Sequence, residues 1–115
     1  MITLENNCEI CIPVCYYDGQ DIIYFAENIL DEHLCNLSNI ISNKLTGFSI
    51  RDEIGFYKNR KMKNKVIYFY YTDDMDFEIN NMIKYILKEM KQETVFVIKN
   101  GVGYIYDSSD VIKGQ

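Results

Sequence analysis

The chain has 115 residues, enough for one domain with a hydrophobic core, and we expect a single domain over residues 1–115. Hydrophobic residues make up 48% of it and charged residues 25%, a composition that excludes a disordered protein. The net charge of −5 argues against a domain that mainly neutralises nucleic-acid phosphates, because such domains are usually basic. No apolar run reaches the roughly 18 residues of a membrane span, and no signal peptide is recognisable, so we expect a cytoplasmic protein.

The first half of the chain predicts a strand and then a helix. Residues 8–17 form a strand pattern in which Pro13 indicates an edge position or a bulge. Asp18-Gly-Gln20 is a turn signal. Residues 21–44 repeat apolar side chains at steps of three and four, which predicts a helix of about four to five turns. Its start is open, because Ile22-Ile-Tyr-Phe25 could also be extended.

The second half of the chain contains the clearest pattern. Phe48–Tyr57 and Lys65–Tyr71 predict two strands joined by a polar hairpin tip at 58–64. Residues 77–92 then change to a helical period. Their apolar side chains share one helix face: Ile79, Met82, Ile83, Ile86, Leu87 and Met90.

The last elements complete the fold prediction. Thr94–Lys99 returns to strand, Asn100-Gly101 is a two-residue hairpin signal, and residues 102–106 pair back as a short strand before a tail at 107–115. The order β-α-β-β-α-β with one extra C-terminal hairpin strand predicts an α+β, ferredoxin-like fold. In that fold an antiparallel sheet carries both helices on one face.

Two helices cover only one face of such a sheet, so the other face is a candidate site. Successive residues of a strand point to opposite faces, which puts Ile67, Phe69 and Tyr71 on one face and Val66, Tyr68 and Tyr70 on the other. Tyrosines on an exposed face need no function, because their hydroxyl groups remain in contact with water. The functional alternative is a surface for a second copy in a homodimer, for another protein, or for stacked bases. The acidic charge favours a protein over a nucleic acid.

Two charged groups flank the strand that begins at Lys65. The basic group comprises five of the twelve basic residues of the chain: Lys58, Arg60, Lys61, Lys63 and Lys65. An acidic patch follows the far end of the strand: Asp73, Asp74, Asp76 and Glu78. A solvated turn explains the basic group, and a helix cap by Asp74 or Asp76 explains the acidic patch. The functional alternative is that the basic group contacts a partner.

The cysteines first suggest a metal site. A strand places Cys11 and Cys15 on one face and Cys8 on the other, and a helix separates His33 from Cys35. We therefore predict reduced cysteines in the core and no metal. One histidine and no glycine-rich phosphate loop leave little for acid–base catalysis, so we predict no enzyme activity and no cofactor.

Three segments and the second helix resemble small uncharacterised ferredoxin-like proteins of phages and mobile elements in low-GC bacteria. The segments are Leu45-Thr-Gly-Phe-Ser49, Gly55-Phe-Tyr57 and Lys91-Gln-Glu-Thr-Val95. Those proteins carry the frame Gly-Phe-Thr, Gly, Gln-Glu-Ser-Val, in which Ser49 and Thr94 of this chain replace Thr and Ser. The resemblance covers the C-terminal two-thirds of the chain, without the cysteine-rich strand or the last hairpin, and it implies the fold and a phage-type source.

The leading hypothesis is a non-enzymatic protein of phage or mobile-element origin. It would bind a host protein in the host cytoplasm, for example a defence nuclease, and block its functional site as anti-CRISPR-type inhibitors do. The alternative is a nucleic-acid or nucleotide-binding module that uses Tyr68, Tyr70 and residues 58–65. A nuclease or nucleotide-cleaving enzyme is the third hypothesis.

Overall fold

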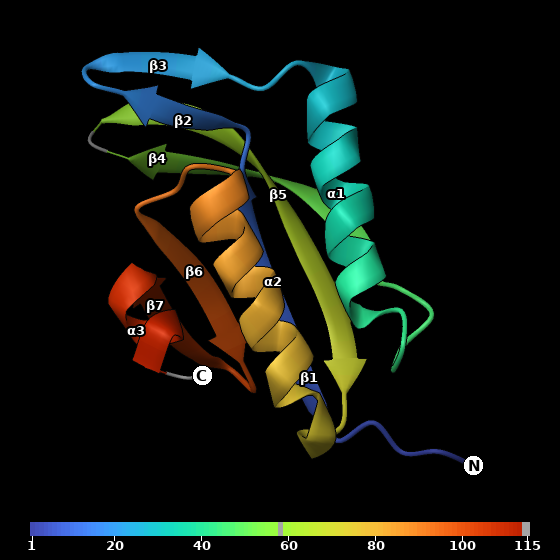
Figure 1. Ribbon diagram of the computed structural model, residues 1–115. Helices are drawn as coiled ribbons and strands as arrows, with labels where there is room; N and C mark the ends of the chain where they lie inside the picture. Colours follow the sequence, from blue (N-terminus) through green and yellow to red (C-terminus); the bar gives the residue numbers. More distant parts are fainter. Residues whose placement is uncertain (58, 114–115) are drawn as a thin grey trace.

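The computed structural model describes residues 1–57 and 59–113. A five-stranded antiparallel sheet carries two long helices on one face, so the predicted α+β class is confirmed (Figure 1). In chain order the elements are β1 (Asn6–Pro13), β2 (Cys15–Asp18), β3 (Asp21–Tyr24), α1 (Glu27–Ile41), β4 (Ser49–Tyr57), β5 (Arg60–Tyr71), the 3-10 turn η1 (Asp73–Met75), α2 (Asp76–Glu89), β6 (Thr94–Lys99), β7 (Val102–Asp107) and α3 (Ser108–Lys113).

The strand order of the main sheet is β4-β5-β1-β6-β7, and β2 and β3 form a separate two-stranded sheet. This small sheet lies at the end of the main sheet where β1 finishes and α1 begins (Figure 1). The helices α1 and α2 run in opposite directions across the same face (Figure 1). Each follows one strand and leads to another, as expected for crossover connections.

The core fills the space between the sheet and these two helices. Ile10 and Ile12 of β1, Ile67 of β5 and Val97 of β6 are fully buried. The helices contribute fully buried side chains as well: Leu37 and Ile41 from α1, and Ile79, Met82 and Ile86 from α2. The helical period predicted over 77–92 is therefore the buried face of α2, which the structure bounds at Asp76–Glu89.

The predicted strand at 8–17 is two strands. β1 ends at Pro13, whose ring nitrogen has no hydrogen to continue the ladder. β2 then turns back through Gly19, with φ +63, into β3. Of the two alternatives left open for the start of the first helix, the structure contains the extended one, because β3 occupies 21–24 and α1 begins at Glu27. β-Branched side chains favour the extended alternative at Ile22 and Ile23.

The C-terminal hairpin turns at Asn100 and Gly101, with φ values of +52 and +81, as the sequence predicts. The predicted tail contains one further helix, α3. Asp107 begins it, because the backbone N–H groups of Ser109 and Asp110 donate to the Asp107 carboxylate. The Asp110 carboxylate in turn accepts from the Asp107 N–H at 2.9 Å, which completes a reciprocal cap.

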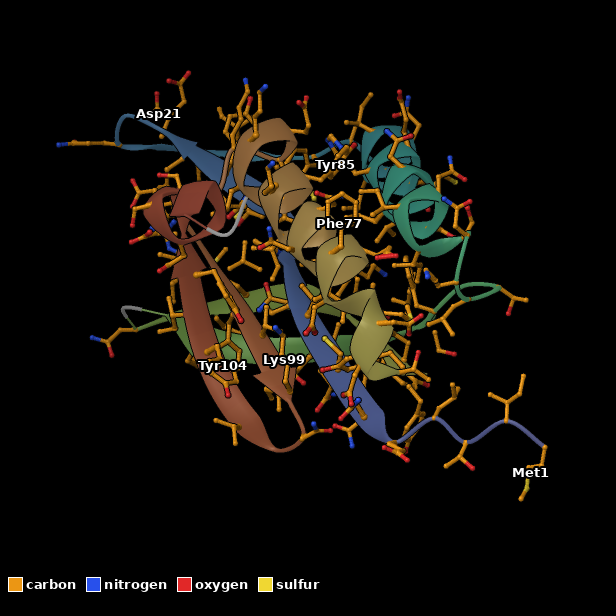
Figure 2. All side chains as sticks on the ribbon, turned by 60° about the horizontal axis from the view of Figure 1, so that its bottom comes forward. Met1, Asp21, Phe77, Tyr85, Lys99 and Tyr104 are labelled. Carbon is orange, nitrogen blue, oxygen red and sulfur yellow. The ribbon has the colours of Figure 1, made fainter. Side chains whose placement is uncertain are left out.

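A polar cluster of three side chains joins the two long helices. The Tyr85 hydroxyl of α2 lies 2.7 Å from Nδ1 of His33 and accepts a hydrogen bond of 2.9 Å from Asn36, both on α1 (Figure 2). His33 also packs edge-on against the ring of Phe25 at 5.3 Å. The single histidine therefore joins two helices and lies half-buried between them.

Replacing Tyr85 by phenylalanine is expected to lower the free energy of unfolding by about 1–3 kcal/mol, because His33 and Asn36 lose a half-buried partner. Urea denaturation measures this change, with Tyr24→Phe as the control because Tyr24 is 61% exposed. Equal stability of Tyr85→Phe and the wild type would show that water satisfies both α1 side chains.

Candidate functional site

The face of the main sheet opposite α1 and α2 carries no helix in the described part of the chain (Figure 1). We call it the open face. One row of directly opposed residues crosses it from β4 to β7: Ser49, Tyr68, Glu9, Ile98 and Gly103. The site described below is built from side chains of this row and of the rows next to it.

The alternation predicted for residues 65–71 is confirmed. Ile67, Phe69 and Tyr71 are buried under the helices, whereas Tyr68 is 38% and Tyr70 is 58% exposed on the open face. Val66 differs from the two tyrosines, since it is only 4% exposed. It lies between Arg51 and Cys11 on the neighbouring strands, and its side chain is shorter than the arginine and tyrosine side chains around it.

A charged cluster surrounds the Tyr68 ring. The Arg51 guanidinium donates a hydrogen bond to the Glu9 carboxylate and lies 3.7 Å from the carboxylate of Glu53. Its carbon is 5.4 Å from the centre of the Tyr68 ring, a cation–π distance. The hydrogen bond that Arg51 donates to Glu9 raises the pKa of Arg51 above its ordinary value. The cluster therefore holds an aromatic ring and a carboxylate side by side on the open face.

Two shallow hollows adjoin the two tyrosines. One has a volume of about 250 Å³, and the residues lining it include Asn7, Glu9, Arg51, Tyr68 and Tyr70. The other, of about 580 Å³, lies between the same tyrosines and the loop before β4, with Leu4 at its border. Tyrosine rings, a carboxylate and backbone edges thus face a space large enough for part of a small molecule.

A further hollow of about 340 Å³ lies where β1, β2, β5 and β6 meet, and we call it the Phe96 hollow. Its lining residues are Cys11, Pro13, Cys15, Tyr17, Met62, Asn64, Gln92, Thr94 and Phe96. Pro13 is paired with Asn64 and Cys11 with Val66, so these side chains share the face of Tyr68.

The cysteines agree only in part with the prediction. Cys8 is buried on the helix side, and Cys11 and Cys15 both line the Phe96 hollow, but they belong to different strands, β1 and β2, and not to one strand face. The prediction of a core position is wrong for Cys35, which is exposed. All four cysteines are free thiols. Burial raises the pKa of the Cys8 thiol to about 12, so this group is a neutral core residue.

The basic group does not gather at the tyrosines. Lys58 lies outside the described residues, and Arg60, Lys61, Lys63 and Lys65 all belong to β5. Lys61, Lys63 and Lys65 are two residues apart and share the strand face opposite to that of Tyr68, whereas Arg60 is on the face of Tyr68. Lys65 donates a hydrogen bond to Asp52 at 2.6 Å, so the charge of the basic group is partly neutralised. The role of these residues in partner binding stays a prediction.

The acidic patch lies at the start of α2. Asp73 and Asp74 belong to η1, and Asp76 and Glu78 belong to the first turn of α2. Hydrogen bonds from Thr72 and Lys44 lower the pKa of Asp74. Neither Asp74 nor Asp76 is the N-cap residue of η1 or α2, since these N-caps are Thr72 and Met75.

A scan against protein-family models found no match to this chain, and a search of the curated proteins found none either. Among solved structures, a phage SAM lyase in complex with S-methyl-5′-thioadenosine is similar, with a TM-score of 0.65 at 14% identity over 90% of each chain. A phage SAM lyase in the apo state has a TM-score of 0.60 at 15% identity, over 94% of this chain and 95% of the other. At these identities the similarity shows a shared fold.

The comparison contradicts the predictions of a non-enzymatic inhibitor and of no enzyme activity, because the structures that share the fold are those of an enzyme. It agrees with the phage-type resemblance, and it gives no support to an anti-CRISPR-type role. No helix in the described part of the chain is long and apolar enough to cross a membrane. A host-protein partner, a second copy and a cytoplasmic location stay predictions.

Several site residues were missed in the sequence. Glu9 and Arg51 come from strands far from Tyr68 in sequence, and only the strand register brings them together. Asn64 was assigned to a polar hairpin tip, but β5 begins at Arg60 and buries it to 3% exposure. Gln92 belongs to Lys91-Gln-Glu-Thr-Val95, a segment that entered the sequence analysis only through the family resemblance.

Proposed function

We propose that this chain is an enzyme that cleaves S-adenosylmethionine (SAM) and releases S-methyl-5′-thioadenosine, with the open face as its site. The observation that carries the proposal is the fold shared with a phage SAM lyase over 90% of both chains. The ferredoxin-like assignment is part of the proposal. It is supported by the order β4-β5-β1-β6 with α1 and α2 as crossovers, to which β7 adds one edge strand.

The chemistry explains why a chain with one histidine is compatible with catalysis. SAM is a sulfonium cation, and release of S-methyl-5′-thioadenosine breaks the bond between sulfur and Cγ, with the electron pair passing to sulfur. A lyase adds no water, so the substrate itself must supply the electron pair that Cγ loses. Either the carboxylate oxygen of the substrate closes a ring on Cγ, or a Cβ–H bond gives its electron pair to form a Cβ–Cγ double bond while its proton passes to water.

Ring closure needs orientation more than it needs an acid or a base. The nucleophile and the leaving group belong to one molecule, so a site that holds the reactive geometry supplies much of the rate. The reaction also neutralises a positive sulfur with a negative carboxylate. Surroundings less polar than water favour the loss of charge in the transition state.

The open face suits a cationic substrate. The net charge of −5 favours the approach of a cation. The faces of Tyr68 and Tyr70 attract a sulfonium group as they attract other cations. Glu9, held in place by Arg51, is an acceptor for ribose hydroxyls or for the amino group of the substrate.

The test is to incubate the purified chain with SAM and to measure S-methyl-5′-thioadenosine by chromatography and mass spectrometry against a sample without protein. Formation in proportion to protein concentration is expected. S-adenosylhomocysteine is the matched control, because its neutral thioether is a poor leaving group and should stay intact. SAM that disappears no faster than in the sample without protein would contradict the proposal.

A further inference from the structure

The side chain of Gln92 is oriented by the end of α2. Lys91 adopts a left-handed conformation with φ +55, and the backbone N–H of Gln92 donates to the carbonyl of Leu87 at 3.1 Å. This is the Schellman arrangement that ends many helices. Lys91 also lies 4.8 Å from the ring centre of Tyr16, which holds the turn against β2. The turn delivers Gln92 to the border of the Phe96 hollow.

The carboxamide of Gln92 has a fixed orientation. Its Nε2 donates to the carbonyl oxygen of Cys15 at 2.8 Å and to that of Met90 at 2.9 Å. Two carbonyl acceptors on Nε2 use both of its hydrogens and identify it as the nitrogen. Among the described residues, no group donates a hydrogen bond to Oε1 of Gln92. Oε1 is also not one of the buried side-chain atoms that lack a partner, so it is accessible from the hollow. Gln92 therefore offers the hollow an acceptor, held in one orientation before any ligand arrives.

The rest of the Phe96 hollow suits a flat aromatic ligand. The Phe96 ring is 46% exposed and that of Tyr17 is 57% exposed, so both present ring surface to the hollow. A Cβ at Gly103 would lie 3.1 Å from the Phe96 ring, so this ring packs directly against the backbone of β7 at Gly103. Met62 adds a polarisable thioether to the lining. The volume of about 340 Å³ is in the range of small-ligand sites.

We infer that the Phe96 hollow binds an aminopurine base and that Gln92 selects its exocyclic amino group. Oε1 of Gln92 accepts a hydrogen bond from an amino N–H of the base. A purine with a carbonyl group at the same position would place its oxygen against Oε1 of Gln92. Two acceptors would then face each other with no hydrogen between them, and the affinity would fall. The inference deepens the proposed function and rests on it for the adenosine nucleoside, whereas the preference for an amino group follows from Gln92 alone.

The test compares the binding of adenosine and inosine by calorimetry, because these nucleosides differ at this amino group and neither carries a sulfonium. The wild type should bind adenosine at least about tenfold more tightly than inosine. Gln92→Met keeps the length of the side chain and should bring the ratio of affinities towards one. Gln20→Met is the matched control, since Gln20 lies in the exposed turn between β2 and β3 and should leave the ratio unchanged.

A second variant keeps the test decisive if Gln92→Met does not fold. Phe96→Leu should weaken adenosine and inosine by the same factor, about tenfold, because stacking does not depend on the exocyclic group. The side-chain amide signal of Gln92 should shift on addition of adenosine to the ¹⁵N-labelled wild type. A Gln92→Met ratio equal to that of the wild type, a Phe96→Leu affinity equal to that of the wild type, or the absence of adenosine binding would overturn the inference.

These outcomes are separate from those of the SAM assay. Cleavage of SAM by a chain without adenosine preference would overturn the inference and leave the proposed function standing. Adenosine preference lost in Gln92→Met, in a chain that leaves SAM intact, would support the inference and refute the proposed function.

Discussion

Replacing Tyr68 by alanine is expected to lower kcat/KM for SAM cleavage by about ten- to a hundredfold. The Tyr68 ring lies opposite Glu9 and 5.4 Å from the Arg51 guanidinium carbon, in the row that crosses the open face. Its loss removes an aromatic surface for the sulfonium group and a contact that holds Arg51 near Glu9. Initial rates of S-methyl-5′-thioadenosine formation at low SAM concentration measure the effect.

Two variants serve as controls for Tyr68→Ala. Tyr68→Phe keeps the ring and should retain most of the activity. Phe77→Ala removes an aromatic side chain of α2 that is 73% exposed on the other side of the molecule, and its activity should equal that of the wild type (Figure 2). Circular dichroism confirms that each variant is folded. A folded Tyr68→Ala with wild-type kcat/KM would remove Tyr68 from the site.

Raising the pH from 9 to 12 is expected to destabilise the protein, by up to about 4 kcal/mol from Cys8 alone. Burial raises the pKa of Cys8 from 9.0 to about 12, so the folded state retains this proton more tightly than the unfolded chain. The stabilisation is complete below pH 9 and is lost as the pH approaches 12. Burial raises the pKa of Tyr71 in the same direction.

Lys99 reinforces this alkaline sensitivity from the neighbouring strand. It is paired with Cys8 in the register of β1 and β6, and Figure 2 labels it on β6 beside Tyr104 of β7. Burial alone would lower the pKa of Lys99, but a hydrogen bond of 3.0 Å to the Tyr106 hydroxyl and the nearby tyrosines raise it. A raised amine pKa stabilises the fold while the amine is charged, and this contribution is also lost at high pH.

Urea unfolding at a series of pH values, in the wild type and in Cys8→Ala, measures the alkaline effect. Cys8→Ala should be less stable near pH 7 because it leaves a small cavity, and its stability should decline less between pH 9 and 12. An unchanged decline in Cys8→Ala would assign the alkaline sensitivity to other groups.

Local sequence patterns were sufficient where one physical signal dominated. The alternation of Ile67 and Tyr68, the helical period of α2 and the Asn100-Gly101 turn each satisfy one geometric requirement, and the structure contains all three. Residues 21–24 carry a pattern that suits both a helix and a strand. These residues form a strand because they pair with β2, and this pairing cannot be recognised in the sequence.

The site was harder to predict because it depends on register and on a helix end. Glu9, Arg51 and Tyr68 come from three strands, and a shift of one residue in any pairing would turn one of them to the other face. The conformation of Lys91 orients Gln92, yet no glycine marks that helix end. The absence of an acid–base cluster was taken as absence of catalysis, although a substrate with its own leaving group and nucleophile requires mainly positioning.

The most direct test of the account is to titrate the ¹⁵N-labelled chain with S-methyl-5′-thioadenosine and to map the backbone amide shifts. Binding on the open face predicts saturable shifts at Glu9, Tyr68 and Phe96 and their strand neighbours, with the exposed residues of α1 and α2 unchanged. Shifts concentrated on α1 and α2, or no saturable shift at millimolar ligand, would contradict it.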